Sequence, residues 1–260
     1  DYAATKGSDI IIITAGLPRK PGMSRDDLLS ANAEIVGKAA TETLAHSPDA
    51  IYIVLTNPLD TMAYLTMKRT GLPRERVVGQ AGILDSARMR AFVALETGVS
   101  VENIDCYVLG GHGDEMVPLT QHSNIAGIPL KEYLPADKLE SIVNRTRKGG
   151  GEIVNLLKTG SAFYAPSAAC AQMAEAILKN KHLIVPCAAY MNGEYGLQDM
   201  FFGVPVMLGR GGMEKIIEYK LDDEEQSMFD TSAAAVKETH EALKNLVTLI
   251  RNSLDSKVTS

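Results

Sequence analysis

The sequence of residues 9–25 is Asp-Ile-Ile-Ile-Ile-Thr-Ala-Gly-Leu-Pro-Arg-Lys-Pro-Gly-Met-Ser-Arg, and it contains the strongest structural signal in the chain. The four isoleucines Ile10–Ile13 show no alternation with polar residues, which predicts a strand buried on both faces, as in a parallel sheet covered by helices. The two prolines and two glycines that follow predict a loop. Ser24 can cap the next helix, whose first turn would contain the favourably placed Asp26 and Asp27.

Two further segments predict strands beside the first. Ile51–Leu55 is almost wholly apolar, Arg76–Gly79 is shorter, and apolar residues at helical spacing lie between the strands. This alternation predicts parallel pairing with right-handed crossovers. Because ligands bind beyond the carboxyl ends of parallel strands, residues 15–25 and the Thr56-Asn57 dipeptide are expected to border a binding site.

The pattern changes after about residue 81. Strand candidates at Ile104–Leu109 and Val117–Gln121 are joined by a turn at Gly110–Glu115. We therefore expect two parts, an incomplete parallel α/β unit at residues 1–81 and an α+β domain at residues 82–260. The other elements expected after residue 81 are helices at 84–96, 138–159, 167–179 and 222–254, and antiparallel strands at 183–190 and 204–209.

Composition disfavours several classes of protein. The net charge of −6 and the isoelectric point near 5.4 argue against nonspecific binding of nucleic acid. The widely spaced Cys106, Cys170 and Cys187 predict buried thiols in a reducing compartment rather than disulfides or zinc ligands. No apolar run approaches the ~20 residues of a membrane span, and no signal peptide is visible. We expect a soluble, cytoplasmic protein without a metal site or a membrane partner.

Several residues could carry chemistry. His112 lies between two glycines in a turn after a predicted strand, and Asp85 and Arg88 are three residues apart on one helix face. Each feature alone has an ordinary structural explanation, such as a solvated histidine or a surface ion pair. The other candidates are Asn57 after the second strand and Arg19 and Arg25 in the proline-rich loop.

One reaction would use all of these groups. Oxidation of a secondary alcohol by a nicotinamide cofactor removes a hydride from carbon and a proton from oxygen, and histidine is the natural proton acceptor near pH 7. A neighbouring carboxylate fixes the histidine tautomer. One arginine can bind a substrate carboxylate through two hydrogen bonds, and a second cation can stabilise the charge that develops on the oxygen. A third cation would be needed only for a second carboxylate.

Four segments, in their order and spacing, closely resemble the lactate/malate dehydrogenase family, and specifically its lactate-dehydrogenase-like malate dehydrogenases. They are Ile13–Arg25, Leu55–Asp60, Leu84–Arg88 and Gly110–Asp114, and the likeness extends to about Leu243. The resemblance implies a partial Rossmann-type parallel sheet followed by an α+β substrate-binding and catalytic domain. It also implies NAD as cofactor and the reversible oxidation of (S)-malate to oxaloacetate.

The resemblance assigns a role to each matching residue. His112 would accept the proton, oriented by Asp85, and Arg88 would bind the C1 carboxylate. Arg25 would polarise the C2 oxygen when the loop closes as a lid over the site. Arg19 matches the position that binds the second carboxylate in malate dehydrogenases, where lactate enzymes commonly have glutamine. The further assignments are substrate and cofactor contacts by Asn57 and cofactor contacts by Asn32, Leu55 and Thr56.

The Gly-x-Gly-x-x-Gly turn and the acidic ribose-binding residue of the family have no counterpart in this sequence. We therefore expect the chain to lack about the first 60 residues of the family pattern, to bind NAD weakly by itself and to leave a sheet edge unpaired. Two alternatives remain, a lactate dehydrogenase and a catalytically incomplete fragment that acts only as a subunit or interaction module. The resemblance also implies a homodimer or a homotetramer.

Overall fold

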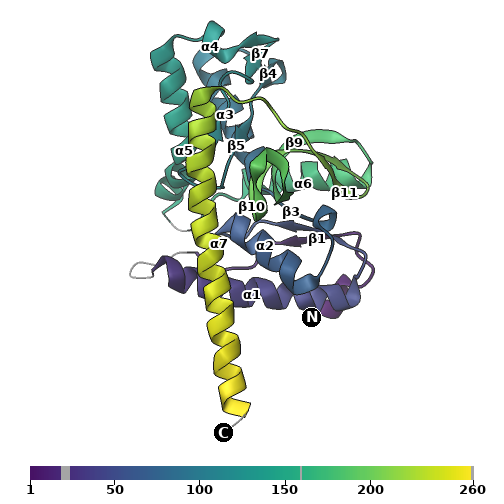
Figure 1. Cartoon of the computed structure of the whole chain (residues 1–260). Helices are drawn as coiled ribbons and strands as arrows, with labels where there is room; N and C mark the ends of the chain where they lie inside the picture. Colours follow the sequence, from purple (N-terminus) through teal and green to yellow (C-terminus); the bar gives the residue numbers. More distant parts are fainter. Residues whose placement is uncertain (19–23, 159, 259–260) are drawn as a thin grey trace.

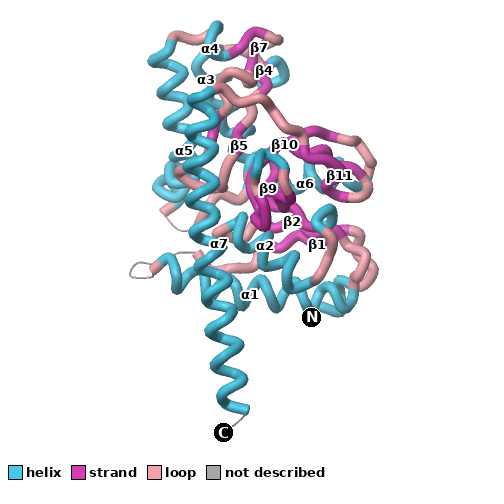
Figure 2. Tube along the Cα trace, in the orientation of Figure 1, coloured by secondary structure: helices cyan, strands magenta, loops and turns pink. Residues whose placement is uncertain are grey.

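A six-stranded mixed sheet with the order β1-β2-β3-β9-β10-β11 forms the centre of the structure (Figures 1 and 2). The computed structural model describes residues 1–18, 24–158 and 160–258, except for the side chains of Arg25 and of residues 246–258. The strands of this sheet are β1 (Ile10–Ile13), β2 (Ile51–Val54), β3 (Val77–Gly79), β9 (Leu183–Asn192), β10 (Gln198–Gly209) and β11 (Gly212–Ile216).

The first three strands are parallel, as the sequence predicted. β1 pairs with β2, and β2 pairs with β3. Helices α1 (Arg25–His46) and α2 (Leu59–Thr70) connect them and cover one face of the sheet (Figure 1). The predicted cap of α1 is confirmed, because Ser24 and Asp27 each accept a backbone hydrogen bond from the other at 3.0 Å. The loops after β1 and β2 therefore lie at the same edge of the sheet.

The prediction that β1 is buried on both faces was wrong. Ile11 and Ile13 are buried against α1 and α2, but Ile12 is 43% exposed. Successive side chains of a strand point to opposite faces, so Ile12 lies on the face away from these helices. There it lines a cavity of about 770 Å³ instead of a packed core.

The second part of the chain joins the same sheet. β3 pairs antiparallel with β9 at Gly79 and Ala188, so the sheet continues across the expected division at residue 81. Helix α3 (Gly82–Thr97) and helix α6 (Tyr164–Leu178) cover the face opposite α1 and α2. Helix α5 (Ala136–Leu157) packs against α3 and continues through the run of three glycines at residues 149–151.

The strands around the His112 turn are shorter than predicted. The predicted strand Ile104–Leu109 is divided into β4 (Ile104–Asp105) and β5 (Val108–Leu109), and β6 (Val117–Pro118) ends three residues before Gln121, so β5 and β6 pair over two residues each. The remaining elements are α4 (Leu130–Tyr133), the strands β7 (Asn124–Ile125) and β8 (Ile128–Pro129), and the 3-10 turns η1 (Tyr2–Thr5), η2 (Arg74–Arg76), η3 (Val101–Asn103) and η4 (Glu194–Gly196).

Helix α7 (Asp223–Val258) runs along the length of the molecule and ties its parts together (Figure 1). Phe229 and Leu243 belong to the apolar clusters on opposite faces of the sheet. The buried His240 accepts a hydrogen bond from the Phe201 amide at 3.3 Å, and burial lowers the pKa of this histidine to about 4. His240 is therefore a neutral packing residue near pH 7.

Within the described residues, no helix combines the length and the apolar character needed to cross a membrane. All three cysteines are buried and free.

Gly203 lets the chain after β5 approach β10 closely. The Gly110 amide donates to the Gly203 carbonyl at 2.8 Å, and a Cβ atom at residue 203 would lie 2.2 Å from the Gly110 carbonyl oxygen. Both atoms in that contact belong to rigid backbone, so a side chain at residue 203 would push the turn away from the sheet.

We expect Gly203→Ala to lower the free energy of unfolding by about 1–3 kcal/mol, because overpacking against backbone forces the chain to shift. Urea denaturation would measure this change. Gly151→Ala is the matched control, since its Cβ would meet no atom within 4 Å on an exposed helical position. It should raise stability by about 0.5–1 kcal/mol. Equal stability of Gly203→Ala and the wild type would contradict the close approach.

Candidate active site

His112 and Asp85 form a hydrogen-bonded pair between the β5–β6 turn and helix α3. The Nδ1 atom of His112 lies 2.7 Å from Oδ2 of Asp85. The Asp85 side chain is almost fully buried. An ionised carboxylate only accepts hydrogen bonds, so Nδ1 carries the proton and the neutral ring keeps a free acceptor at Nε2. The pair thus fixes the tautomer that a proton acceptor needs.

Opposing effects set the pKa of His112. Burial alone disfavours the imidazolium, but the charge of Asp85, its hydrogen bond and the charge of Asp60 outweigh burial and the repulsion from Arg88. The pKa of His112 is therefore raised above its ordinary value of 6.5. A raised pKa makes His112 a stronger base, which is neutral and able to accept a proton once the pH exceeds that pKa.

Arg88 shares the same carboxylate. Its Nη1 atom donates to Oδ1 of Asp85 at 3.1 Å. Gly149 of α5 leaves room for its side chain, since a Cβ there would lie 3.2 Å from Cδ of Arg88, whereas a Cβ at Gly150 would make an ordinary contact with Nη1 at 3.8 Å. Glycine destabilises a helix interior, and the space that Arg88 needs explains its presence at residue 149.

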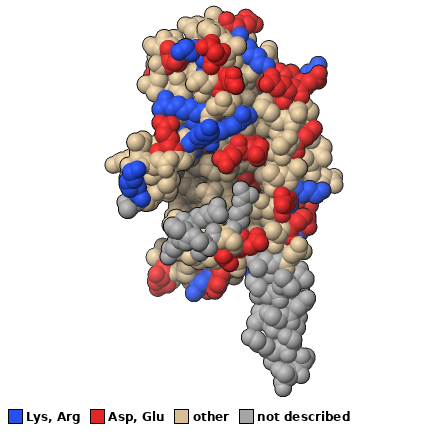
Figure 3. Space-filling view, turned by 90° about the vertical axis from the view of Figure 1, so that its left-hand side faces the viewer, with Lys and Arg blue, Asp and Glu red and all other residues tan. Residues whose placement is uncertain are grey.

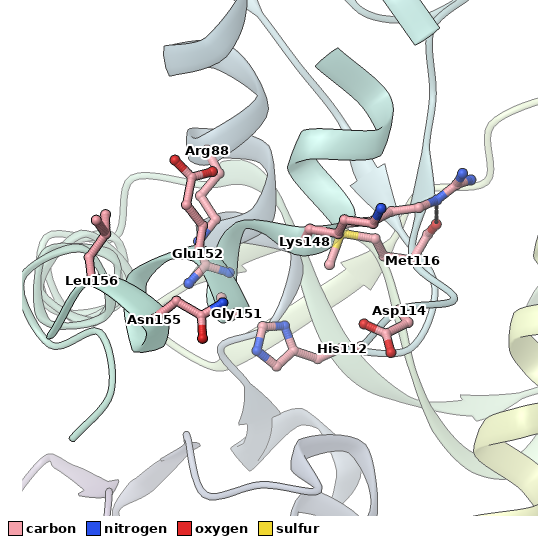
Figure 4. A pocket seen from close by; sticks show the side chains of 12 residues that line it. Arg88, His112, Asp114, Met116, Lys148, Gly151, Glu152, Asn155 and Leu156 are labelled. Carbon is pink, nitrogen blue, oxygen red and sulfur yellow. Dashed lines mark hydrogen bonds between the residues drawn. The ribbon is translucent and has the colours of Figure 1, made fainter. Parts of the chain in front are cut away.

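A cavity of about 630 Å³ lies in front of His112 and Arg88. The imidazole points into this cavity, and Arg88, Lys148 and Asn155 surround it (Figure 4). The surface is hollowed on this side of the molecule, with lysine and arginine side chains above the hollow (Figure 3). Sequence reasoning did not select Lys148 or Asn155, although both lie on the helix whose glycines adjoin Arg88. Arg88, Arg147 and Lys148 outnumber Asp114 and Glu152 among its charged lining residues, so the cavity suits a small anionic molecule.

A second cavity, of about 770 Å³, extends from the same histidine to the sheet. It is lined by Ile12 and Thr14 at the end of β1, by Leu55 and Asn57 after β2, and by His112. Its position at the carboxyl ends of parallel strands is the one at which such sheets bind ligands. Sequence reasoning did not select its other polar lining residues Gln80, Ser161 and Ser167. Of these three, only Gln80 had a signal in the sequence for a place at the site, which is its position directly after the predicted strand Arg76–Gly79.

Asn32 joins the two loops at this edge of the sheet. Its Oδ1 accepts from the Leu17 amide at 2.7 Å, and its Nδ2 donates to the Asn57 carbonyl at 2.7 Å. Thr56 adds a second link by donating to the Ala15 carbonyl at 2.7 Å. Asn32 is buried, so its amide organises the loop backbone that borders the second cavity.

Two predicted residues cannot be placed in this site. Arg19 and the side chain of Arg25 lie outside the described residues. The structure brings together His112, Asp85 and Arg88, and it places Asn57 and Leu55 on the adjoining cavity.

Two family models match the chain. Residues 1–79 match the NAD binding domain of lactate/malate dehydrogenases, and residues 83–247 match the alpha/beta C-terminal domain of the same enzymes. The malate dehydrogenase of Roseiflexus sp. (strain RS-1) is 57% identical over 244 residues, which cover 94% of this chain and 79% of that relative.

Solved structures show the same fold. The malate dehydrogenase from Salinibacter ruber superposes with a TM-score of 0.91 at 48% identity, and the match covers 95% of this chain and 79% of that one. The lactate dehydrogenase from Cryptosporidium parvum, complexed with lactic acid and nicotinamide adenine dinucleotide, gives a TM-score of 0.90 at 40% identity, covering 94% and 79%.

We expect Asp85→Asn to lower the pKa of His112 by about one unit or more, because it removes the negative charge that favours the imidazolium. NMR titration of the imidazole ring would measure this. Asp114→Asn is the control, since it removes an exposed carboxylate from the same turn, where water screens the charge. Equal shifts in the two variants would show that the buried pair has no special effect.

Proposed function

Because the chain belongs to the lactate/malate dehydrogenase family, we propose that His112, Asp85 and Arg88 carry proton transfer and substrate binding in its reaction. That reaction is the NAD-dependent, reversible oxidation of malate to oxaloacetate. The observation that carries the assignment is the buried Asp85, whose two oxygens bind His112 at 2.7 Å and Arg88 at 3.1 Å. A proton acceptor and a carboxylate-binding cation thus face one cavity in fixed relative positions.

His112 acts at Nε2. This atom accepts the proton of the C2 hydroxyl, and the imidazolium that forms is stabilised by the charge of Asp85. NAD held at the sheet edge beside Asn57 and Leu55 would supply the acceptor for the hydride of C2. In the reverse direction His112 returns its proton to the oxygen of the C2 carbonyl. Oxidation therefore needs neutral His112, which predominates above its raised pKa, and reduction needs the protonated form.

Arg88 binds the C1 carboxylate of the substrate. Its guanidinium is planar and can donate two parallel hydrogen bonds, and its contact with Asp85 holds it beside His112. Arg25 polarises the C2 oxygen, and Arg19 binds the second carboxylate of malate. The assignments of Arg25 and Arg19 rest on their positions in the family pattern. Curated relatives at 54–58% identity are malate dehydrogenases, which supports malate over lactate.

The residues at the sheet edge fit the nicotinamide end of NAD. Asn57 and Leu55 line the cavity that reaches His112, and Thr56 and Asn32 hold the backbone around it. At Gly16 a Cβ atom would lie 2.4 Å from the Thr56 side chain, so these loops are packed closely. Asn57 also borders the substrate, because its loop adjoins both His112 and the strand ends.

The organisation of the protein follows the same family pattern. We assign residues 1–81 to the dinucleotide-binding domain and residues 82–260 to the substrate-binding domain, which is supported by the meeting of the two family models between residues 79 and 83. We assign the protein to the cytoplasm, where three buried free thiols would stay reduced. The family pattern supports a homo-oligomer, a dimer or a tetramer.

We expect His112→Asn to lower kcat/KM for malate by at least about 10²-fold, because it removes the proton acceptor. Initial rates of NAD reduction, followed by NADH absorbance, would measure this. His182→Asn is the control, since His182 is an exposed histidine that pairs with Glu214 away from both cavities. Unchanged rates in His112→Asn, or a wild type that stays inactive at an NAD concentration high enough to offset weak binding, would contradict the proposed function.

Arg19→Gln should reduce the preference for oxaloacetate over pyruvate by about 10²-fold or more in the ratio of kcat/KM values, because it removes the charge that binds the second carboxylate. Lys20→Gln, which removes the neighbouring charge in the same loop, should leave the preference nearly unchanged. A preference that survives Arg19→Gln would exclude this residue as the determinant of specificity.

A further inference from the structure

Three elements from distant parts of the sequence hold the turn that carries His112. Three successive backbone amides of the turn each donate to a different partner. Gly110 donates to the carbonyl of Gly203 on β10 at 2.8 Å, Gly111 to Oγ of Ser232 on α7 at 2.9 Å, and His112 to Oδ2 of Asp60 on α2 at 2.9 Å. The backbone of the histidine is therefore fixed by a carboxylate.

Asp60 is an unusual partner for that amide. It is only 6% exposed, and its other oxygen, Oδ1, is buried with no hydrogen-bond partner among the described residues. A buried carboxylate costs far more free energy than a buried hydroxyl, and each unpaired buried oxygen calls for an explanation. Burial raises the pKa of Asp60 to about 6, although the His112 amide and the charge of His112 oppose that rise.

The neighbouring contact provides a comparison within the same turn. Ser232 holds the Gly111 amide with a neutral hydroxyl at the same distance of 2.9 Å. Anchoring an amide here thus does not require a charge. What Asp60 adds beyond an anchor is a negative charge beside His112, at the first turn of α2, where the helix dipole favours a carboxylate.

We propose that Asp60 is a positioning residue for His112, which fixes the backbone of the histidine and supplies a second buried negative charge to its imidazole in addition to that of Asp85. This inference rests on the proposed role of His112 as proton acceptor. Asp60 acts through the histidine, and its carboxylate makes no contact with the cavity in front of Arg88.

The charges around His112 favour this role. Asp85 contacts the ring directly and Asp60 holds its amide, whereas Arg88 opposes its protonation. The two buried carboxylates thus provide two negative charges beside the two positive charges of the half-buried Arg88 guanidinium and the protonated His112 ring. The other charged groups that line the cavities around His112 are Asp114 and Glu115 on its own loop, Arg147, Lys148 and Glu152 on α5, Glu238 on α7 and Asp26 on α1.

The test is Asp60→Asn, which keeps a carbonyl oxygen to accept from the His112 amide and removes the charge. NMR titration should show the pKa of His112 lowered by about half a unit to one unit. The pH profile of kcat/KM for malate oxidation should move to lower pH by the same amount, with little change in KM. Ser232→Ala, which removes the neighbouring anchor without changing charge, should leave the titration of His112 in place.

Two results would overturn the proposal. One is an unshifted pKa of His112 in Asp60→Asn, and the other is an equal shift in Ser232→Ala, which would indicate a purely structural anchor. If Asp60→Asn does not fold, wild-type protein with ¹³C-labelled aspartate carboxyls provides the same test, because the Asp60 signal should respond to the titration of His112, and no response would overturn the proposal. These titrations need neither substrate nor NAD, so their outcome is separate from that of the activity assays.

Discussion

The buried carboxylate of Asp85, shared between His112 and Arg88, is the interaction on which the site depends. An ionised group with 1% exposure is stable only when its oxygens are paired, and here one oxygen binds the imidazole and the other binds the guanidinium. Helix α3, the β5–β6 turn and Gly149 of α5 must therefore lie close together. Gly82 at the start of α3 permits this close packing, because a Cβ atom there would lie 2.6 Å from the Val108 carbonyl oxygen.

The mixed sheet provides the frame for this meeting. Its parallel strands place two loops at one edge, where Asn32 joins them, and its antiparallel hairpin of β9 and β10 supports the histidine turn through Gly203. Helix α7 contributes Ser232 from the far end of the chain. The cavity in front of Arg88 and the cavity at the strand ends thus adjoin each other, with His112 lining both.

Local sequence signals predicted the features that depend on interactions between residues close together in the sequence. The isoleucine run predicted β1, the cap at Ser24 predicted the start of α1, and the spacing of Asp85 and Arg88 predicted one helix face. The exposure of Ile12 was not predictable, because periodicity cannot show what covers the second face of a strand. Asp60 and Ser232 were missed for a related reason. They lie 52 and 121 residues from their partners, and only tertiary structure brings them to the histidine turn.

The balance of charges around His112 matters for both directions of the proposed reaction. Each buried carboxylate stabilises the imidazolium, which favours proton removal from malate and equally the protonated state that reduction of oxaloacetate requires. In the proposed mechanism Arg88 must stay close to bind substrate, yet its charge opposes protonation of the ring. A single carboxylate between the two cations would leave a net positive charge in a poorly solvated site when the ring is protonated. When it is ionised, the second carboxylate, Asp60, offsets that positive charge and lowers the energetic cost of protonating His112.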